Sequence, residues 1–538
     1  MKRTILLCLM GTALTAPAFA QSVQDGQSGD GLDDIIVTAQ KRAEGLSDVP
    51  ISISAVSGKL LESYGQTSLE QLSYSVPNLK ITQTAIANRI AIRGIASGDN
   101  KGFEQSVAMF VDGVYYGRDQ LSRLPLVDLE RVEVLRGPQP TLFGNNAIAG
   151  AVNMVTRRPT SELEASLSGL YEFNHQEAQL TGVISGPVAD GVGARLVGYY
   201  RHMDGFFRNT QTRREEPNLR EAFVRGIVDF DRGGPARASL KLEYADFRTR
   251  GQPREAFGAT GTYSAIFTGP LAVDTVEDYV KADGGYVSDN RVLNAVLNTE
   301  FDVGEHVLTS VTGYVDYRTR ETVDVDFTEL ALLDGTTQGE DYAQFSQELR
   351  LTSPGGEKFD YIAGVYYQHS RLDADDQVRF NRTFLGFGPP FNAIGDTSNE
   401  RVYAQKSDLF SAFAQGKLEL ARSLRLTAGA RFNHERKSGA RTLVINRGAA
   451  NLFPLPVVLG TFRALNIEAH QISGRFRQSW LDPMANLQFD ASDALMVYVS
   501  FARGTKAGAL TFGPTRGRIR RRWRGPGRSS STVNGRTI

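Results

Sequence analysis

Apolar and polar residues alternate with a period of two through much of the chain after residue 163. In residues 239–244, Leu240, Leu242 and Tyr244 alternate with polar side chains, and residues 306–318 and 424–433 repeat the pattern. This period places successive side chains on opposite faces of a β-strand. About 13 such strands are predicted between residues 163 and 510. The apolar face predicted within residues 306–318 consists of Val307, Val311, Val315 and Tyr317.

Two architectures share this alternation, a soluble β-sandwich and an antiparallel transmembrane β-barrel with apolar side chains toward lipid. The strands run about ten residues, which suits a membrane crossing. Long polar stretches such as 250–290 and 372–405 join some strands, whereas other connections are short. Long loops at one end and short turns at the other are typical of an outer-membrane barrel, so the barrel is favoured.

Residues 48–159 differ in their pattern of apolar and polar residues and predict a compact α+β unit. Ser57 precedes a short helix that ends at Tyr64 and could cap it. A second helical turn is expected over residues 68–73. The predicted strands are 49–56, 107–111, 114–116 and 131–135, with a tight turn at Asp112-Gly113.

The first 20 residues predict a secretory signal peptide. Lys2 and Arg3 precede a short apolar run, and Ala18-Phe19-Ala20 is a small-x-small cleavage site. The apolar run is too short to favour a membrane anchor. The single cysteine, Cys8, lies inside this segment, so the mature chain is expected to have no disulfide and no cysteine-bound metal.

Residues 21–33 are polar and predicted to be disordered. A short β-prone run follows, with no partner strand nearby. An extended, unpaired segment can add a strand to the sheet edge of another protein, although an ordinary edge strand would read the same way. The run consists of Asp34, Ile35, Ile36, Val37, Thr38 and Ala39.

The charges balance at 60 basic and 60 acidic residues, but their distribution is uneven. Residues 514–538 contain several arginines and no acidic residue. A basic tail can bind nucleic acid. The favoured interpretation is instead that residues 513–538 are not the natural continuation of the chain, and that a frameshift near residue 513 replaced further strands.

Four motifs follow one another along the chain, namely Ala91-Ile92-Arg93-Gly94, residues 110–115, residues 129–139 and residues 142–156. In this order they resemble the plug signatures of TonB-dependent receptors of Gram-negative outer membranes. Residues 34–39 with Gln40-Lys41-Arg42 look like the TonB box, and residues 346–351 and 498–508 are similar to barrel strands of the family. Pro140 and Asn145, in the turn before the last plug strand, depart from the family pattern.

The resemblance implies an N-terminal α+β plug followed by an antiparallel transmembrane β-barrel of the 22-strand type, with only about 13 strands present. The implied organisation is a signal peptide at 1–20, a leader with the TonB box at 21–47, a plug at 48–159, a partial barrel at 160–512 and a tail at 513–538. It also implies the cell outer membrane as location. The implied partners are outer-membrane lipid, TonB with its inner-membrane energising complex, and a bulky ligand, without nucleic acid.

Site residues follow from the same resemblance. TonB is expected to bind residues 34–39. Charged plug residues are expected to pair with the inner wall of the barrel rather than with each other, namely Arg93, Glu130, Glu133 and Arg136. The expected ligand contacts at the apex of the plug are Gln83, Thr84, Asn88, Tyr115 and Tyr116.

The implied function is energised uptake of a scarce, bulky ligand, a ferric siderophore first, with cobalamin, a saccharide or an aromatic compound as alternatives. No cofactor is expected. An enzyme is disfavoured because the six histidines show no metal spacing and no nucleophile or phosphate-loop motif occurs. These histidines are His175, His202, His306, His369, His434 and His470.

The rival hypothesis is that this chain is a non-functional remnant of such a receptor. A plug of about 110 residues is roughly 34 Å across. Fourteen tilted strands close into a cylinder only about 28 Å wide, whereas 22 strands give about 44 Å. The strands present here could therefore not close around the plug.

Overall fold

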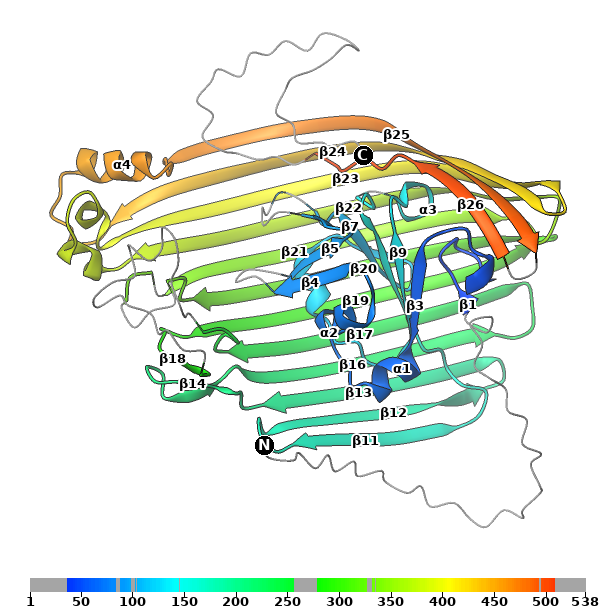
Figure 1. Cartoon of the computed structure of the whole chain (residues 1–538), viewed down its shortest axis with the longest axis horizontal. Helices are drawn as coiled ribbons and strands as arrows, with labels where there is room; N and C mark the ends of the chain where they lie inside the picture. Colours follow the sequence, from blue (N-terminus) through cyan, green and yellow to red (C-terminus); the bar gives the residue numbers. More distant parts are fainter. Residues whose placement is uncertain are drawn as a thin grey trace, which may run out of the picture.

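The computed structural model describes residues 36–83, 88–97, 102, 104–144, 146–255, 278–326, 331–333, 335–492 and 495–508. A large curved sheet carries a smaller α+β unit, the inner unit, on one face (Figure 1). This face of the large sheet is called the inner face below. The predicted signal peptide and residues 21–35 of the predicted leader, which include Asp34 and Ile35, lie outside the described residues.

The inner unit is built around a five-stranded sheet in the order β3-β9-β10-β7-β8 and a three-stranded sheet in the order β4-β5-β6. In the larger of the two, β10 pairs parallel with β7, and the other pairs are antiparallel. The elements are β3 (Ile53–Ser57), α1 (Gly58–Ser63), α2 (Leu69–Ser75), β4 (Leu79–Gln83), β5 (Asn88–Ile92), β6 (Ile95–Ala96), β7 (Val107–Val111), β8 (Val114–Tyr116), η3 (Asp119–Arg123), β9 (Leu129–Arg136), α3 (Pro140–Phe143) and β10 (Gly150–Thr156).

Both predicted helices form, and both begin where their capping residues stand. The Ser57 side chain accepts a hydrogen bond from the Leu60 backbone N–H. Ser68 and Gln71 form a reciprocal capping box at the start of α2, which satisfies backbone donors that the first turn leaves unpaired. The strand expected over 49–56 begins only at Ile53, because residues 46–48 form a 3-10 turn, η2 (Leu46–Asp48).

Replacing Gly58 by Ala is expected to destabilise the inner unit. A Cβ at Gly58 would lie 1.7 Å from the Leu129 carbonyl oxygen, a backbone atom that cannot rotate away. We expect a loss of about 3 kcal/mol, because α1 must shift away from β9. The control is Gly460→Ala in α4 (Leu455–Ala464), where a Cβ meets nothing within 4 Å. That change should leave stability unchanged or raise it by up to about 1 kcal/mol. Denaturant unfolding of both variants provides the comparison, and equal effects would contradict the packing argument.

The large sheet contains 13 antiparallel strands, which confirms the predicted number. Each strand pairs with the next along the chain, apart from short strands inserted in two connections. The strands are β11 (Glu164–Glu172), β12 (Glu177–Ala189), β13 (Val192–Met203), β16 (Asn218–Asp231), β17 (Ala236–Arg250), β19 (Tyr286–Val303), β20 (His306–Val323), β21 (Thr336–Thr352), β22 (Phe359–Phe380), β23 (Thr397–Ala421), β24 (Leu424–Arg447), β25 (His470–Ser492) and β26 (Leu495–Ala502). The inserted strands are β14 (Phe207–Asn209), β15 (Arg214–Glu216) and β18 (Val280–Lys281).

The connections differ between the two ends of this sheet, as expected. One end, the turn end, carries short turns such as the one between Ala421 and Leu424. The opposite end, the loop end, carries α4, the 3-10 turns η6 (Arg382–Gly386) and η7 (Phe391–Ile394), and the inserted strands (Figure 1).

The predicted strand lengths and one predicted loop were wrong. About ten residues per strand were expected, but β23 has 25 residues. The expected polar loop over 372–405 is mostly strand, because β22 continues to Phe380, opposite Thr397 in β23. Backbone pairing continues here although both faces carry polar side chains.

The predicted face alternation is confirmed in β17 and wrong in β20. In β17, Leu240, Leu242 and Tyr244 face outward and are exposed, while Lys241 is buried on the inner face. In β20 the apolar side chains of Val311, Val315 and Tyr317 are instead buried on the inner face. They pack against the inner unit, and this apolar partner inside the sheet reverses the expected polarity.

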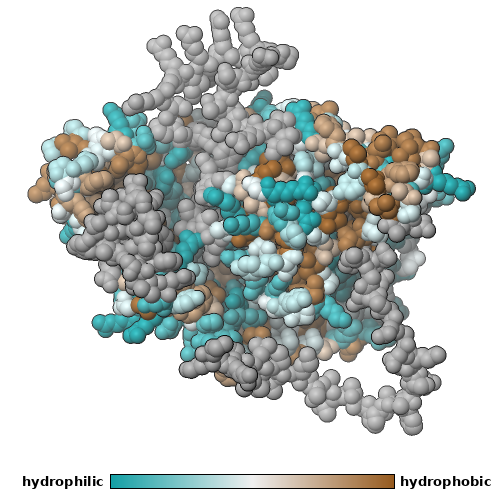
Figure 2. Space-filling model, in the orientation of Figure 1, coloured by the Kyte–Doolittle hydropathy of each residue, from teal (hydrophilic) through white to brown (hydrophobic). Residues whose placement is uncertain are grey.

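The large sheet does not close. Its terminal strands β11 and β26 pair on one side only within the described residues. Figure 2 shows apolar residues gathered at the upper right, where Figure 1 places β26. The exposed apolar side chains of this edge strand are Leu495, Val497, Val499 and Phe501.

Candidate functional site

The predicted strand-donating segment is paired within the chain. Residues 36–45, the N-terminal hairpin, contain β1 (Ile36–Val37) antiparallel to β2 (Glu44–Gly45). The expectation that this run has no partner nearby was therefore wrong. The cause is a reversal of the chain after residue 38, where the Lys41 N–H donates to the Thr38 carbonyl and Lys41 has φ +59°.

The N-terminal hairpin is held between the inner unit and the large sheet. Val37 and Ala39 are almost fully buried, whereas Ile36 is 48% exposed. The two buried residues belong to an apolar cluster that reaches from β7 to the large sheet. Other members of this cluster are Phe110, Leu135, Phe143, Ala151, Ile362 and Phe413.

A buried carboxylate fixes the middle of the hairpin. Glu133, on β9, is fully buried, and its Oε1 accepts hydrogen bonds from both the backbone N–H and the hydroxyl of Thr38, at 2.8 and 3.0 Å. Arg131 donates to the same oxygen at 2.8 Å, and Asn153 donates to Oε2 at 3.1 Å. A buried charge is stable only when such partners surround it, so the position of Thr38 depends on the hydrogen bonds that the Glu133 carboxylate accepts.

Lys41 connects the hairpin to the large sheet through a buried ion pair. Its ammonium donates to both carboxylate oxygens of Glu348 on β21, at 3.1 and 3.2 Å, and both side chains are less than a tenth exposed. The same ammonium lies 5.8 Å from the Phe110 ring centre and 6.0 Å from the Phe143 ring centre. These rings add a cation–π attraction.

Two further charged residues of the hairpin contact the same end of the sheet. Arg42 donates to the Ser353 hydroxyl and the Tyr361 carbonyl, at 2.8 and 2.9 Å. Glu44 pairs with Lys417 on β23 at 3.5 Å. A cavity of about 530 Å³ borders these residues at the turn end of the sheet. The segment next to the predicted TonB box is thus fixed to the sheet and adjoins open space.

Ion pairs also join the inner unit to the large sheet farther from the hairpin. Arg118 pairs with Glu340 at 2.9 Å. Burial alone would lower the pKa of Arg118, but Glu340 and Asp119 raise it above its ordinary value. The remaining pairs are Arg123–Glu321 at 2.8 Å, Asp112–Lys241 at 2.5 Å, Asp128–Arg195 at 2.5 Å and Glu104–Lys437 at 3.8 Å.

Association of the inner unit with the sheet should weaken in acid because of Asp112. Burial alone would raise the pKa of its carboxyl, but Lys241 and hydrogen bonds such as that from Thr156 lower it below the ordinary value. A lowered folded pKa stabilises the folded state above pH of about 4, and this contribution disappears as the pH falls through the folded value. Denaturant unfolding across pH 2–6 tests this. Asp112→Asn should flatten the acid limb of the profile, and an unchanged limb would contradict it.

The four charged inner-unit residues were expected to pair with the inner wall of the barrel. This was wrong, because the partners that the structure gives them lie outside the large sheet. Arg93 donates to Ser52, and Arg136 donates to Ser54 and the Pro77 carbonyl. Glu130 and Glu133 both pair with Arg131. Arg93 and Arg136 border a cavity of about 410 Å³ between the inner unit and the sheet, without an ion pair across it in the described part of the chain.

The expected ligand residues are only partly described. Thr84 and the side chain of Gln83 lie outside the described residues. Asn88 is buried, and its carbonyl accepts from Gln105. Tyr115 and Tyr116 are 4% and 1% exposed, so neither is open to a ligand in this arrangement, and their contact with a ligand stays a prediction. Both faces of β8 are covered, by the rest of the inner unit and by the large sheet, and burial raises the pKa of both phenols.

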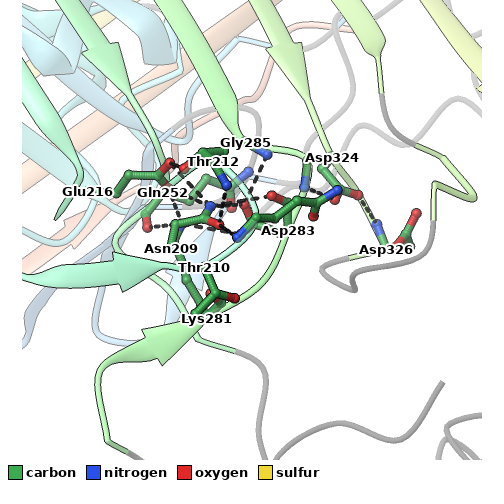
Figure 3. A network of polar contacts seen from close by, with 12 residues as sticks. Asn209, Thr210, Thr212, Glu216, Gln252, Lys281, Asp283, Gly285, Asp324 and Asp326 are labelled. Carbon is green, nitrogen blue, oxygen red and sulfur yellow. Dashed lines mark hydrogen bonds and ion pairs between the residues drawn. The ribbon is translucent and has the colours of Figure 1, made fainter. Parts of the chain in front are cut away.

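A buried polar network holds the loops at the loop end of the sheet (Figure 3). Lys281 pairs with Glu216 at 2.6 Å and Asp283 at 3.2 Å, and Asn209 donates to both carboxylates. Nearby, burial together with Asp326 and Asp283 raises the pKa of Asp324 to about 6. These contacts join β14, β15 and β18, so the loops form one connected structure.

Two further features, a membrane-spanning helix and a metal-binding cluster, are absent from the described residues. No described helix is long and apolar enough to cross a membrane. No described cluster of three or more His, Cys, Asp or Glu side chains is placed to hold a metal ion.

Two families match the chain. The family "TonB-dependent Receptor Plug Domain" matches residues 45–151, and "TonB dependent receptor-like, beta-barrel" matches residues 189–535. The second match covers more than half of the chain, so this chain belongs to the TonB-dependent receptors. The inner unit is its plug. The match reaches residue 535 and thus includes much of the predicted tail, so the frameshift stays a prediction.

Individual relatives agree with this membership. The chain is 32% identical to the pesticin receptor of Yersinia pestis over 210 residues, which are 38% of this chain and 30% of that protein. It is 28% identical to the vitamin B12 transporter BtuB of Vibrio vulnificus over 213 residues, 38% of this chain and 33% of that protein. These matches span about a third of each relative's length. The relatives are receptors and transporters, not enzymes.

The fold of a solved receptor agrees as well. The ferric yersiniabactin uptake receptor FyuA of Yersinia pestis superimposes with a TM-score of 0.70 at 19% identity, covering 88% of this chain and 67% of that chain. The match supports the arrangement of a plug on an antiparallel sheet.

Proposed function

We propose that this chain acts in TonB-dependent uptake across the outer membrane, with residues 34–39 as the segment that TonB binds. The supporting observation is the N-terminal hairpin, whose strand β1 lies between plug and sheet beside a cavity at the turn end. On this proposal the turn end faces the periplasm, where TonB arrives.

The hairpin explains how binding and pulling would be coupled. TonB could add a strand to residues 34–39 only after Val37 and Thr38 leave their positions, because β1 is paired with β2, Val37 is buried, and the Thr38 N–H is bonded to Glu133. Thr38 is hydrogen-bonded to Glu133 within the plug, and Lys41 is ion-paired to the sheet. Force on residues 34–39 would therefore break the Thr38 and Lys41 contacts first and then act on β9 and the plug.

The proposed cargo is a ferric siderophore. The name of the superimposed receptor FyuA gives ferric yersiniabactin as its ligand. The vitamin B12 transporter among the relatives keeps cobalamin as an alternative. Saccharides and aromatic compounds stay open as further alternatives, because the expected ligand residues are buried or lie outside the described residues.

A second candidate, a remnant that transports nothing, is favoured by the open sheet. The outer sides of β11 and β26 have unpaired backbone groups within the described residues. In lipid each such group costs several kcal/mol, so an open sheet does not span a membrane by itself.

Uptake of radiolabelled ferric yersiniabactin, in a host that lacks its own receptors, tests the proposal. We expect uptake only when the chain and a functional TonB are both present. Equal uptake with and without the chain would contradict the cargo assignment. Absence of the chain from the outer-membrane fraction would instead favour the remnant.

A further inference from the structure

A group of basic side chains lies on the outer face of the large sheet, the face opposite the plug. It consists of Lys406 on β23, Arg436 on β24, and Arg475 and Arg477 on β25, and is called the outer basic cluster below. All four residues are exposed. They share the face of the exposed apolar residues Phe410, Phe432 and Leu481, because they stand at the same parity in their strands.

The cluster begins where the apolar band of the outer face ends. Along β24 the outward residues from Leu424 to Phe432 are apolar, and they start at the turn end. This length of about nine residues is what a tilted strand needs to cross a bilayer. Aromatic side chains mark the boundary of the band, as in the girdles of outer-membrane barrels. The exposed boundary residues include Tyr244, Tyr314, Phe345, Phe410 and Phe432.

The register brings like charges directly together. Arg436 lies opposite Arg477, and Ser438 lies between Lys406 on one side and Arg475 on the other. Like charges in directly opposed positions destabilise a sheet unless an anion compensates them. A bound anion would relieve this repulsion.

The chain supplies little negative charge at this place. Among the described residues, no carboxylate forms an ion pair with any member of the cluster, and Arg436 Nε instead contacts His434 at 3.1 Å. Asp408 lies opposite Arg436 in the register, but it accepts from Tyr367 and lies 2.8 Å from His369 Nδ1. Residues 509–538, which follow the described chain, contain no Asp or Glu.

The equivalent position on β20 is compensated internally. Arg318 and Arg320 follow the boundary residue Tyr314 on the outer face, and both pair with Asp341 on β21, at 2.7 and 2.5 Å. The outer basic cluster thus differs from the Arg318 and Arg320 site in having no ion-paired carboxylate among the described residues. Both groups are exposed and lie beyond the apolar band.

We propose that the outer basic cluster binds the phosphate groups of lipid in the outer leaflet. Guanidinium groups bind phosphate in a bidentate manner, and basic residues just outside an apolar band lie at the depth of lipid headgroups. The inference rests on the proposed outer-membrane location, but it requires neither the proposed cargo nor TonB.

The test uses the purified full chain in detergent and measures binding of bis-phosphorylated lipid A and of chemically dephosphorylated lipid A by native mass spectrometry. We expect the phosphorylated form to bind at least tenfold more tightly. The double variant Arg436→Ser with Arg477→Ser should lose this preference. Equal binding of the two lipids by the unaltered chain would overturn the proposal.

Two controls separate phosphate recognition from folding and from general charge. Arg318→Ser with Arg320→Ser removes the same charge from the compensated site and should leave the preference unchanged. Arg436→Lys with Arg477→Lys keeps the charge but loses the bidentate geometry, so its preference for phosphorylated lipid A should lie between those of the unaltered chain and the serine variant. An equal loss in the Arg318 and Arg320 variant would show nonspecific attraction and overturn the proposal. Because the assay needs no transport, a failure of uptake leaves its result interpretable.

Discussion

Glu348→Gln is expected to release the N-terminal hairpin from the large sheet. The change leaves the Lys41 ammonium buried without its carboxylate partner. Removing one partner of a buried ion pair costs about 3 kcal/mol, which corresponds to roughly a 100-fold larger population of the released hairpin. The remaining contacts of the hairpin, including the β1–β2 pair, the Arg42 hydrogen bonds and the Thr38–Glu133 bonds, are then opposed by the cost of the unpaired ammonium.

Thiol labelling at Val37 measures this release. The only cysteine of the chain is Cys8, within the predicted signal peptide, so Val37→Cys provides a single reporter in the processed chain. Val37 is 0% exposed, and labelling should therefore be slow until Glu348 is changed. Ile36→Cys, at a position that is already 48% exposed, should label quickly in both backgrounds. Glu419→Gln, on β23, removes an acid that has no ion pair among the described residues and should not accelerate labelling. Unchanged labelling at Val37 in Glu348→Gln would contradict the role of the pair.

Glu133→Gln is expected to destabilise the plug by about 3 kcal/mol. Glu133 is fully buried and accepts from Thr38, Arg131 and Asn153. A neutral amide would place an N–H group among donors and leave Arg131 with its less buried partner Glu130. Leaving a buried charge without compensation is among the most costly single substitutions.

Denaturant unfolding of the full chain, followed by a probe in the plug, measures this loss. Glu130→Gln is the matched control, since Glu130 precedes Glu133 on the same strand but its side chain is 48% exposed. Its replacement should change stability by less than about 1 kcal/mol. Equal effects of the two changes would show that burial of the Glu133 network is not what stabilises β9.

Local signals in the sequence were sufficient for most of the fold. Ser57 marked the start of the first helix, because capping depends on residues three positions apart. A second turn was expected from residue 68, and the capping role of Ser68 emerged from the structure. The two-residue period marked the strands of the large sheet and their number. Plug motifs added the order of the domains, since fixed residues at tight turns identify a family more specifically than composition does.

Contacts between the units could not be predicted from local pattern. Lys41 and Glu348 are 307 residues apart, and neither differs from a solvated charge in its sequence neighbourhood. The inward apolar face of β20 depends on the plug surface that it meets. The burial of Tyr115 and Tyr116 has the same cause, because β8 is covered on both sides only once the sheet surrounds the plug. The TonB-box resemblance marked the segment, and the charge of Lys41, two residues after the β-prone run, did not identify a partner.

On the proposed function, TonB adds a strand to residues 34–39 in competition with the resting position of the hairpin. Binding of the purified periplasmic domain of TonB to the full chain measures this competition. Isothermal titration should give tighter binding to Glu348→Gln, by at least tenfold, because release of the hairpin no longer opposes it. Val37→Pro, which removes a backbone N–H from the added strand, should abolish binding. Equal affinities for the unaltered chain, Glu348→Gln and Val37→Pro would contradict the account.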